Sequence, residues 1–192
     1  MIKLNKEDIR KRLQGHTPVR IVNPSLIPSA VLIALFEKKG RWHVLLTLRP
    51  PDIASHQNQI CFPGGRADEG EKALEAALRE AEEEMGIRPE DVEILGRLDD
   101  ILTITYYRIS SFVGVIPYPY PFKVSEKEIA EVIEIPLETF ADPKNFRRDN
   151  NWKFEGHYYP VYFFNCGEHV VWGATAKIMK QFLELVMDWK EP

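Results

Sequence analysis

The segment spanning residues 64–87, GGRADEGEKALEAALREAEEEMGI, constrains the fold more than any other part of the chain. Apolar residues at 4, 3, 4 spacing predict a helix, with Gly86 at its end and an apolar face of Leu74, Leu78, Ala81 and Met85. On the opposite face the helix would gather Glu80, Glu83 and Glu84 within about 100° of arc. Like charges one turn apart destabilise a helix by roughly 0.2–0.5 kcal/mol per pair. A ligand of opposite charge is therefore expected beside the glutamates.

The chemistry of these side chains indicates which ligand would bind. Carboxylate oxygens without nearby histidine or cysteine suit hard divalent cations such as Mg²⁺ or Mn²⁺. Such an ion would remove the repulsion, bind phosphate oxygens and lower the pKa of a bound water. The Pro63–Gly65 turn would let the backbone approach it, with the Gly65 carbonyl as one more hard oxygen. Arg79, four residues from both Glu75 and Glu83, is predicted to pair with them. For a bare glutamate cluster, a solvated helix face is the simpler interpretation.

The full spacing of the segment favours the metal site. It reads Gly65, five residues, Glu71, seven residues, Arg79-Glu80-Ala81, one residue, Glu83-Glu84, one residue, Gly86-Ile87. This resembles the Nudix hydrolase box, GX5EX7REUXEEXGU, at every fixed position, with Ala81 as a small version of the apolar residue U. The resemblance implies an α/β (α+β) fold, a Nudix-type α/β/α sandwich with a mixed β-sheet and a loop–helix–loop catalytic motif. It also implies hydrolysis of a nucleoside diphosphate linked to another group.

The resemblance further implies roles for individual carboxylates. Glu83 and Glu84 correspond to the principal metal ligands and Glu80 to a third, so that Glu83 and Glu80 would act in catalysis through the metal. The Gly65 carbonyl corresponds to a further ligand. The implied cofactor is therefore Mg²⁺ or Mn²⁺.

Two further roles follow from the same resemblance. Glu71 and Arg79 correspond to structural supports of the loop and helix. A catalytic base must also take the proton from the attacking water, and Nudix enzymes often draw it from a loop distant from the box. Glu128, in the segment SEKEIAEV, is the candidate, with Glu126 as the second choice.

Residues 45–65, LLTLRPPDIASHQNQICFPGG, are similar to the signature of the coenzyme A pyrophosphatase branch, LLTxR[SA]x3Rx3Gx3FPGG. Three positions depart from it, with Pro50 for Ser or Ala, Ala54 for Arg and Asn58 for Gly. The candidate substrate-binding residues here are Arg49, His56, Gln59, Phe62 and Gly64. The first three could replace the missing guanidinium. The resemblance continues over roughly residues 28–185, with a further departure at Tyr106-Tyr107, where we expect core residues instead of the usual Ser-Gly pair.

The implied reaction is metal-dependent hydrolysis of coenzyme A or its derivatives, giving 3',5'-ADP and 4'-phosphopantetheine. The departures leave open a different Nudix pyrophosphatase activity, on ADP-ribose, NADH or dinucleotide polyphosphates. A Nudix-fold binding module without catalysis is a third reading. The presence of Glu80, Glu83 and Glu84 opposes it.

The remaining patterns predict one Nudix domain over residues 1–192, with 1–27 as an N-terminal extension and the box at 64–87. The loop at 117–121 should be stiff, and the pattern leaves open whether its aromatics form an interface or a substrate lid. Periodicity predicts helices over 6–14 and 174–189, strands over 29–36, 43–49 and 59–62, strands within 92–103 and 106–118, and a hairpin joining 157–164 to 169–173.

Composition bounds the partners. The net charge of -4 and the pI near 5.8 argue against non-specific nucleic-acid binding, and a small nucleotide substrate is expected instead. No apolar run approaches the ~18 residues of a membrane span, and the amino terminus does not read as a signal peptide. Cys61 and Cys166 are expected as small buried residues in a reducing compartment. We therefore expect a cytoplasmic protein and leave its oligomeric state open, a homodimer included.

Overall fold

The computed structural model describes residues 4–51 and 58–192. Within these residues eight strands form a mixed sheet whose main path runs β3–β2–β1–β7–β5, while β4 pairs with β1, β6 with β7 and β8 with β2. β1 and β7 are parallel, and the other pairs are antiparallel. The strands are β1 (Ile27–Lys38), β2 (Arg41–Leu48), β3 (Ile60–Cys61), β4 (Gly64–Arg66), β5 (Glu93–Arg97), β6 (Ile101–Leu102), β7 (Tyr107–Val115) and β8 (Glu131–Pro136).

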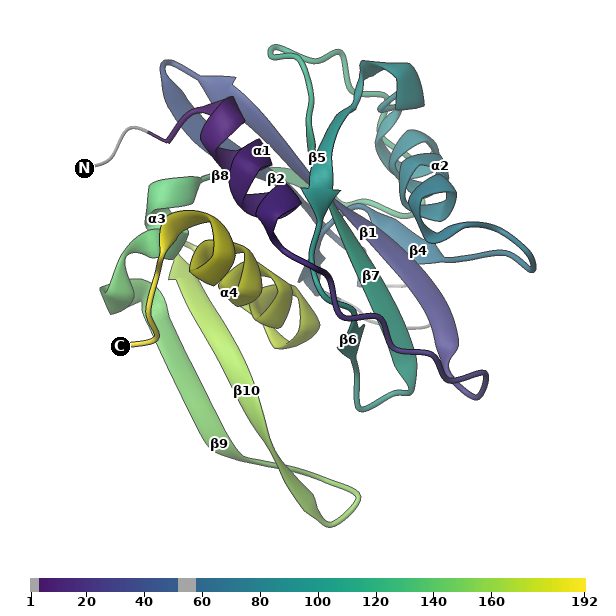
Figure 1. Ribbon diagram of the computed structural model, residues 1–192, viewed down its shortest axis with the longest axis vertical. Helices are drawn as coiled ribbons and strands as arrows, with labels where there is room; N and C mark the ends of the chain where they lie inside the picture. The colour runs from purple at the N-terminus through teal and green to yellow at the C-terminus, as the bar shows by residue number, and fades with distance from the viewer. Residues whose placement is uncertain (1–3, 52–57) are drawn as a thin grey trace.

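Helices cover both faces of this sheet, as Figure 1 shows. α2 (Ala73–Met85) packs on β1 and β4 over one face. α1 (Lys6–Gly15) and α4 (Gly173–Met187) contact each other over the opposite face, and the short α3 (Leu137–Ala141) packs beside α4. The 3-10 turns η1 (Pro89–Asp91) and η2 (Pro143–Asn145) complete the connections. The chain is thus an α/β/α sandwich with a mixed sheet, which confirms the predicted fold class.

Apolar layers on both sides of the sheet hold the sandwich together. The larger layer lies between the sheet and α1, α3 and α4, and includes the fully buried Ile9, Leu46 and Phe182. A second layer lies under α2, where Leu32 and Ala81 are fully buried. Burying one large aliphatic or aromatic side chain contributes about 1.5–3 kcal/mol, so these layers fix α2 against the sheet.

A smaller antiparallel sheet extends from the sandwich. It consists of β9 (Phe146–Phe154), β10 (His157–Cys166) and β11 (His169–Trp172). Figure 1 shows the β9–β10 hairpin projecting away from the body, with its turn at Glu155 and Gly156, which have φ values of 47° and 84°. The predicted hairpin between β10 and β11 is confirmed. Patterning did not predict β9, because the sequence FRRDNNWKF is polar on both faces.

The predicted helices form close to their expected bounds. α1 follows Asn5, whose side chain accepts a hydrogen bond from the Asp8 amide and caps the helix. The helix predicted over residues 174–189 ends instead at Met187, where Asp188 turns the chain with a φ of 53°. The segment before β1 is tied down as well, because the Val19 amide donates to Asp99 at 2.8 Å.

One loop residue differs from the sequence-based expectation, and a second loop has contacts that the sequence did not reveal. Tyr106 is 60% exposed with a φ of 64°, so the prediction that it is a core residue is wrong. The loop at 117–121 is anchored to the body, because Tyr118 stacks on Phe36 at 4.9 Å and the Tyr120 hydroxyl donates to Asp91 at 2.8 Å.

Both cysteines are free. Cys166 is buried as expected, and burial raises the pKa of its thiol to about 12. Cys61 is half-buried beside Thr47, and burial raises the pKa of its thiol as well. In the described part of the chain, no helix combines the length and apolar content needed to cross a membrane.

Candidate active site

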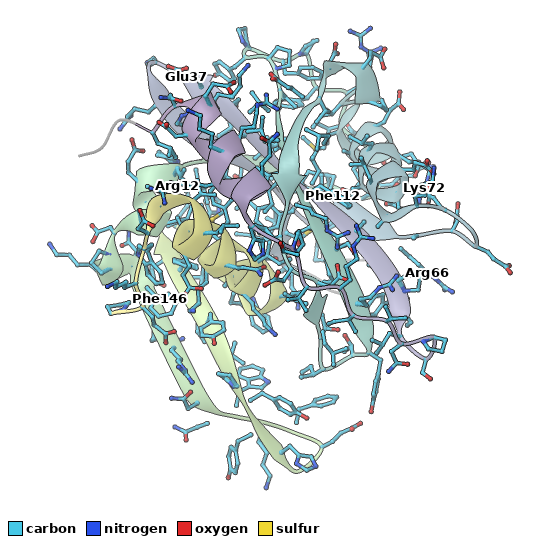
Figure 2. The ribbon with its side chains drawn as sticks, viewed as in Figure 1. Arg12, Glu37, Arg66, Lys72, Phe112 and Phe146 are labelled. Carbon is cyan, nitrogen blue, oxygen red and sulfur yellow. The ribbon has the colours of Figure 1, made fainter. Side chains whose placement is uncertain are left out.

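The glutamate-rich helix is rotated relative to the prediction. Its buried face consists of Ala76, Ala77, Ala81, Glu84 and Met85, whereas the two leucines of the predicted apolar face are only half-buried. Small alanine side chains let the helix approach β1 and β4 closely, and this closeness decides which face is covered. Figure 2 marks Arg66 at the end of β4 and Lys72 just before α2, at the two ends of the loop that leads into the helix.

Glu84 is the residue most affected by this rotation. It is only 1% exposed and lies on the buried side of the helix, so the expectation that it lies opposite the apolar face with Glu80 and Glu83 is wrong. Its Oε2 accepts a hydrogen bond of 3.1 Å from the Gly64 amide, and its Oε1 lies 3.7 Å from Nη1 of Arg49. Burial raises the pKa of Glu84 to about 7. A carboxylate held in this way is costly unless a cation lies beside it.

Arg79 is the hub of a charged network on the same helix. Its guanidinium holds Glu71 through two hydrogen bonds, Nε to Oε1 at 2.9 Å and Nη2 to Oε2 at 3.1 Å. Its Nη1 donates to Glu80 at 2.8 Å and to Glu83 at 3.0 Å. These bonds raise the pKa of Arg79 and lower the pKa of Glu71. The predicted pair with Glu83 is confirmed, but the one with Glu75 is wrong.

The loop before the helix is joined to the same network. Nη2 of Arg79 also donates to the Arg66 carbonyl at 3.1 Å, and the Asp68 amide donates to Glu71 at 2.9 Å. Glu75 instead pairs with Lys72 at 3.1 Å, at the start of α2. Arg79 and Glu71 therefore fix the loop against the helix, the position expected of structural supports.

Gly65 faces Glu80 directly. A Cβ atom at residue 65 would lie 2.4 Å from Oε2 of Glu80, so a larger residue would displace this carboxylate. Glu80 is half-buried, and its burial raises its pKa. Glu83 is the most exposed of the three glutamates, with 56% of its side chain accessible. The three carboxylates therefore grade from buried to exposed along one side of α2.

The candidate base lies on a loop attached to α2. The Lys123 amide donates to the Met85 carbonyl and the Ser125 amide to the Glu84 carbonyl, both at 2.9 Å. Glu128 is half-buried behind Ser125, and its charge adds to the rise in pKa of Glu84. Glu126 is exposed. The structure therefore brings Glu128 toward the acidic cluster.

The candidate substrate residues fall into different environments. Arg49 lies next to Glu84, its amide donates to the Gln59 carbonyl, and within the described residues its buried Nε has no hydrogen-bond partner. Phe62, in contrast, is 2% exposed and packs in the main core, where its side chain is not accessible for the predicted substrate contact. A Cβ at Gly64 would lie 2.3 Å from the Ala30 carbonyl, so this position needs glycine for packing on β1. His56 lies outside the described residues.

Asn58 explains one departure from the coenzyme A signature. Its φ is 55°, in the left-handed region that glycine adopts readily and that asparagine tolerates better than most residues. The substitution of Asn for the Gly of the signature therefore keeps the backbone conformation. Ala54, the position of the missing Arg, lies outside the described residues.

A hard divalent cation would need several oxygen ligands close together at the carboxylates of α2. In the described ranges, 4–51 and 58–192, no three acidic, histidine or cysteine side chains stand close enough together to hold an ion as placed. The oxygen donors themselves fit a hard cation, because Glu80, Glu83 and Glu84 are all carboxylates. The guanidinium of Arg79 already shows that Glu80 and Glu83 can share one positive charge.

The fold and the acidic cluster together define an α/β/α protein with a glutamate-rich loop–helix–loop. The pattern of the NUDIX domain family matches residues 26–154. The chain is 37% identical over 147 residues to "Uncharacterized Nudix hydrolase NudL" of Pectobacterium atrosepticum, covering 76% of each chain. It is 32% identical over 187 residues to the NudL of Photorhabdus laumondii, covering 97% of this chain and 99% of that one. The chain belongs to the Nudix hydrolase family.

A solved structure agrees at the level of the fold. The MutT/nudix family protein from Enterococcus faecalis superposes with a TM-score of 0.58, over 97% of this chain and 71% of that one. The two sequences are only 15% identical, so this similarity concerns the fold alone. Together, the family match and the relatives identify the protein as a hydrolase.

Proposed function

We propose that this Nudix hydrolase cleaves the diphosphate of coenzyme A or its derivatives, giving 3',5'-ADP and 4'-phosphopantetheine. The observation that carries the proposal is the ion pair between the half-buried Arg49 and the buried Glu84. It joins the segment similar to the coenzyme A signature to the glutamate box. The conformation of Asn58 supports the same reading, since it keeps the backbone geometry that the Gly of the signature would adopt.

Divalent metal is part of this proposal. Glu80, Glu83, Glu84 and the Gly65 carbonyl would hold Mg²⁺ or Mn²⁺, which when bound neutralises charge on the phosphate oxygens and acidifies a water. To do so, Glu80 or Glu83 must turn away from the Arg79 guanidinium, which now bonds both. Arg79 and Glu71 would then keep the loop and helix in register while the carboxylates change partner.

The protein groups have separate tasks in the proposed reaction. Glu128 takes the proton from the attacking water, because it is the half-buried carboxylate of its loop and faces the cluster. Arg49 binds a phosphate oxygen through its guanidinium, since a guanidinium is a natural partner for phosphate and its buried Nε has no hydrogen-bond partner within residues 4–51 and 58–192. It would thereby replace the Arg of the signature. Gln59 and His56 remain further candidates for substrate contact.

The second candidate is hydrolysis of ADP-ribose, NADH or a dinucleotide polyphosphate. It is favoured by Ala54, which removes the signature Arg. Either activity needs the same acidic cluster and differs only in what flanks the diphosphate. We further propose that the enzyme is cytoplasmic, because both cysteines are free, and that a homodimer is its candidate assembly.

The test is turnover by the purified chain. Coenzyme A and ADP-ribose would be compared with Mg²⁺, with Mn²⁺ and with a chelator, and the products identified by mass. Metal-dependent release of 4'-phosphopantetheine, at a higher kcat/KM than for ADP-ribose, supports the proposal. Cleavage of ADP-ribose without cleavage of coenzyme A assigns the second candidate. No cleavage of any nucleotide would leave a binding module without catalysis.

A further inference from the structure

A cavity lies between the small sheet and the end of β2, apart from the acidic cluster. Its volume is about 540 Å³, within the range of small-molecule sites. Leu48 and Ile60 line it from the main sheet, and Trp152, Phe163 and Trp172 line it from the small sheet. None of these five residues belongs to the glutamate box. Leu48, Ile60 and also Asn58 belong to the segment similar to the coenzyme A signature, so the cavity joins that segment to the small sheet.

One wall of this cavity is a row of aromatic rings. The strand register pairs Phe163 of β10 with Arg147 of β9 and with Trp172 of β11. The Arg147 guanidinium lies 3.8 Å from the centre of the Phe163 ring, and Trp172 stacks on Phe163 at 6.3 Å with 13° between the planes. Trp152 extends the row, with its ring 5.7 Å from that of Trp172. The stacked pair of Phe163 and Trp172 and the tilted contact of Trp152, at 44° to Trp172, hold these rings in place.

The rings remain accessible although they are large and apolar. Trp152 is 39% exposed, and Phe163 and Trp172 are half-buried. Flat aromatic walls of this kind bind flat ligands, because stacking contributes about 1–3 kcal/mol per nucleobase. A flexible aliphatic chain would gain no comparable stacking from the same surface.

The polar residues of the cavity select among flat ligands. Glu168 and His169 line it, and Nε2 of His169 lies 3.6 Å from a carboxylate oxygen of Glu131 and 4.0 Å from one of Glu168. The Glu168 carboxylate lines the cavity and would repel a phosphate group, and Glu131, which contacts His169 without lining the cavity, adds to the negative charge. Glu168 would accept a hydrogen bond from an exocyclic amino group, as acidic side chains do with bases. The cavity thus fits a neutral planar ring that carries an amino group.

The cavity and the acidic cluster meet at the ends of the same two strands. Leu48 lines the cavity, and the next residue, Arg49, reaches Glu84. On β8, Glu131 pairs with Leu48 and contacts His169, and Glu128 lies three residues earlier in the chain. The two regions are therefore joined through neighbouring residues at the end of β2 and the start of β8, an arrangement that would suit one extended ligand occupying both.

We propose that this cavity binds the adenine base of the substrate whose diphosphate lies at the acidic cluster. The inference deepens the proposed function and rests on it for the position of the diphosphate. It holds for coenzyme A and for ADP-ribose alike, because both carry adenine. Base recognition is then a property of the small sheet, and phosphate chemistry a property of α2 and its loops.

The test is calorimetric titration of the full chain with AMP, with ribose 5-phosphate as the matched ligand that lacks the base, in metal-free buffer. We expect AMP to bind at least about tenfold more tightly than ribose 5-phosphate, since one stacked base contributes that much affinity. Trp152→Ala should weaken AMP binding about tenfold and leave ribose 5-phosphate binding unchanged. Tyr158→Ala is the matched control, because Tyr158 is an exposed aromatic of the same hairpin that does not line the cavity.

A second variant guards against misfolding of the first. Val170 lines the cavity and is 46% exposed, so Val170→Met should fold and place a longer, uncharged side chain in the cavity. The smaller space left for the base should weaken AMP binding in this variant too. Equal affinity for AMP and ribose 5-phosphate, or unchanged AMP binding in both cavity variants, would overturn the inference. Tryptophan-dependent AMP binding without any diphosphate hydrolysis would instead overturn only the proposed function.

Discussion

The acidic cluster and the aromatic cavity flank the same strand ends, but they are built in opposite ways. The cluster draws its carboxylates from one helix, and Arg79 ties two of them to Glu71 through hydrogen bonds of 2.8–3.1 Å. The cavity draws Trp152, Phe163 and Trp172 from three different strands, and ring contacts hold them. The charges of the cluster therefore come from one local segment of the chain, whereas the shape of the cavity depends on segments that lie far apart in the sequence.

This difference assigns separate tasks to the two regions. Hydrolysis of a diphosphate needs fixed charges at defined spacing, which one helix supplies. Discrimination among substrates needs a surface whose shape can change without disturbing those charges. The two regions should therefore fail independently when they are mutated, and each variant below tests that separation.

Glu83→Gln is expected to have the largest effect. The substitution removes the charge of an exposed candidate metal ligand, so kcat should fall by about a hundredfold or more, since even the groups that support metal ligands are worth 10–100-fold. The melting temperature and the affinity for AMP should change little. Steady-state kinetics and calorimetry on the same preparation measure both.

The control for this variant is its neighbour. Glu82→Gln removes the same charge from the same helix at an exposed position that the box leaves unspecified. It should retain near-normal turnover. If Glu83→Gln and Glu82→Gln are equally active, the assignment of Glu83 as a metal ligand is wrong.

Arg79→Lys should have the next largest effect. Lysine keeps the charge but cannot make the two-bond contact with Glu71 while also bonding Glu80 and Glu83. We expect a 10–100-fold loss of kcat and a loss of about 1–3 kcal/mol in the free energy of unfolding. Denaturant unfolding and turnover assays measure the two effects.

The matched control for Arg79→Lys is Arg88→Lys. Arg88 makes a similar two-bond contact with Asp91, at 2.9 and 3.0 Å, but at an exposed turn. This variant should lose less stability and little activity. Comparable losses of stability and activity in both variants would mean that the contact of Arg79 with Glu71 contributes no more than an ordinary ion pair at the surface.

Residues 64–87 were largely predictable because the information is local. Spacing predicted the helix and the pair of Arg79 with Glu83, and the glycine at position 86 predicted where the helix ends. The rotation of the helix was not predicted, since Leu74 and Leu78 outweigh Ala76 and Ala77 in any measure of hydrophobicity. Only close packing on β1 and β4 decides that the alanines, and Glu84 with them, are buried.

The aromatic cavity was not predictable for a different reason. Trp152 and Trp172 lie twenty residues apart in the sequence, and β9, which carries Trp152, shows no alternation of apolar residues. Their proximity depends on the register of three strands and on the end of β2. The burial of Phe62 was not predicted for a similar reason. The signature identified Phe62 as a candidate for substrate binding, but its environment depends on packing in the core, which the sequence does not show.

Glu84→Gln should stabilise the folded protein in a pH-dependent manner. Burial raises the pKa of Glu84 from 4.5 in the unfolded chain to about 7 in the fold. The folded state therefore binds more protons between these values, and wild-type stability falls as the pH rises through about 7. Glutamine at this position removes the loss. The free energy of unfolding of the variant should therefore exceed that of the wild type by about 1–3 kcal/mol at slightly alkaline pH, and the difference should be smaller in acid.

Thermal unfolding in chelator at about pH 5 and about pH 8 tests the prediction. Added Mg²⁺ should raise the melting temperature of the wild type more than that of the variant, because a ligand that binds only the folded state stabilises it. A gain in stability that is equal at both pH values would show that Glu84 is not the titrating group. If the variant is less stable than the wild type at both pH values, the hydrogen bond from the Gly64 amide requires the negative charge of the Glu84 carboxylate.

Substitutions of Asn58 are expected to have the smallest effect on the protein. They test whether the backbone conformation at residue 58 or the asparagine side chain explains the departure from the signature. At a φ of 55°, Asn58→Gly should change the free energy of unfolding by less than about 1 kcal/mol, because glycine relieves the strain of the left-handed region but adds freedom to the unfolded chain. Asn58→Val should lose about 1–3 kcal/mol, because a β-branched residue strains this region. Urea unfolding measures both. Equal stability of the two variants would mean that the backbone does not require this conformation, and the departure from the signature would then have to be explained by the asparagine side chain itself.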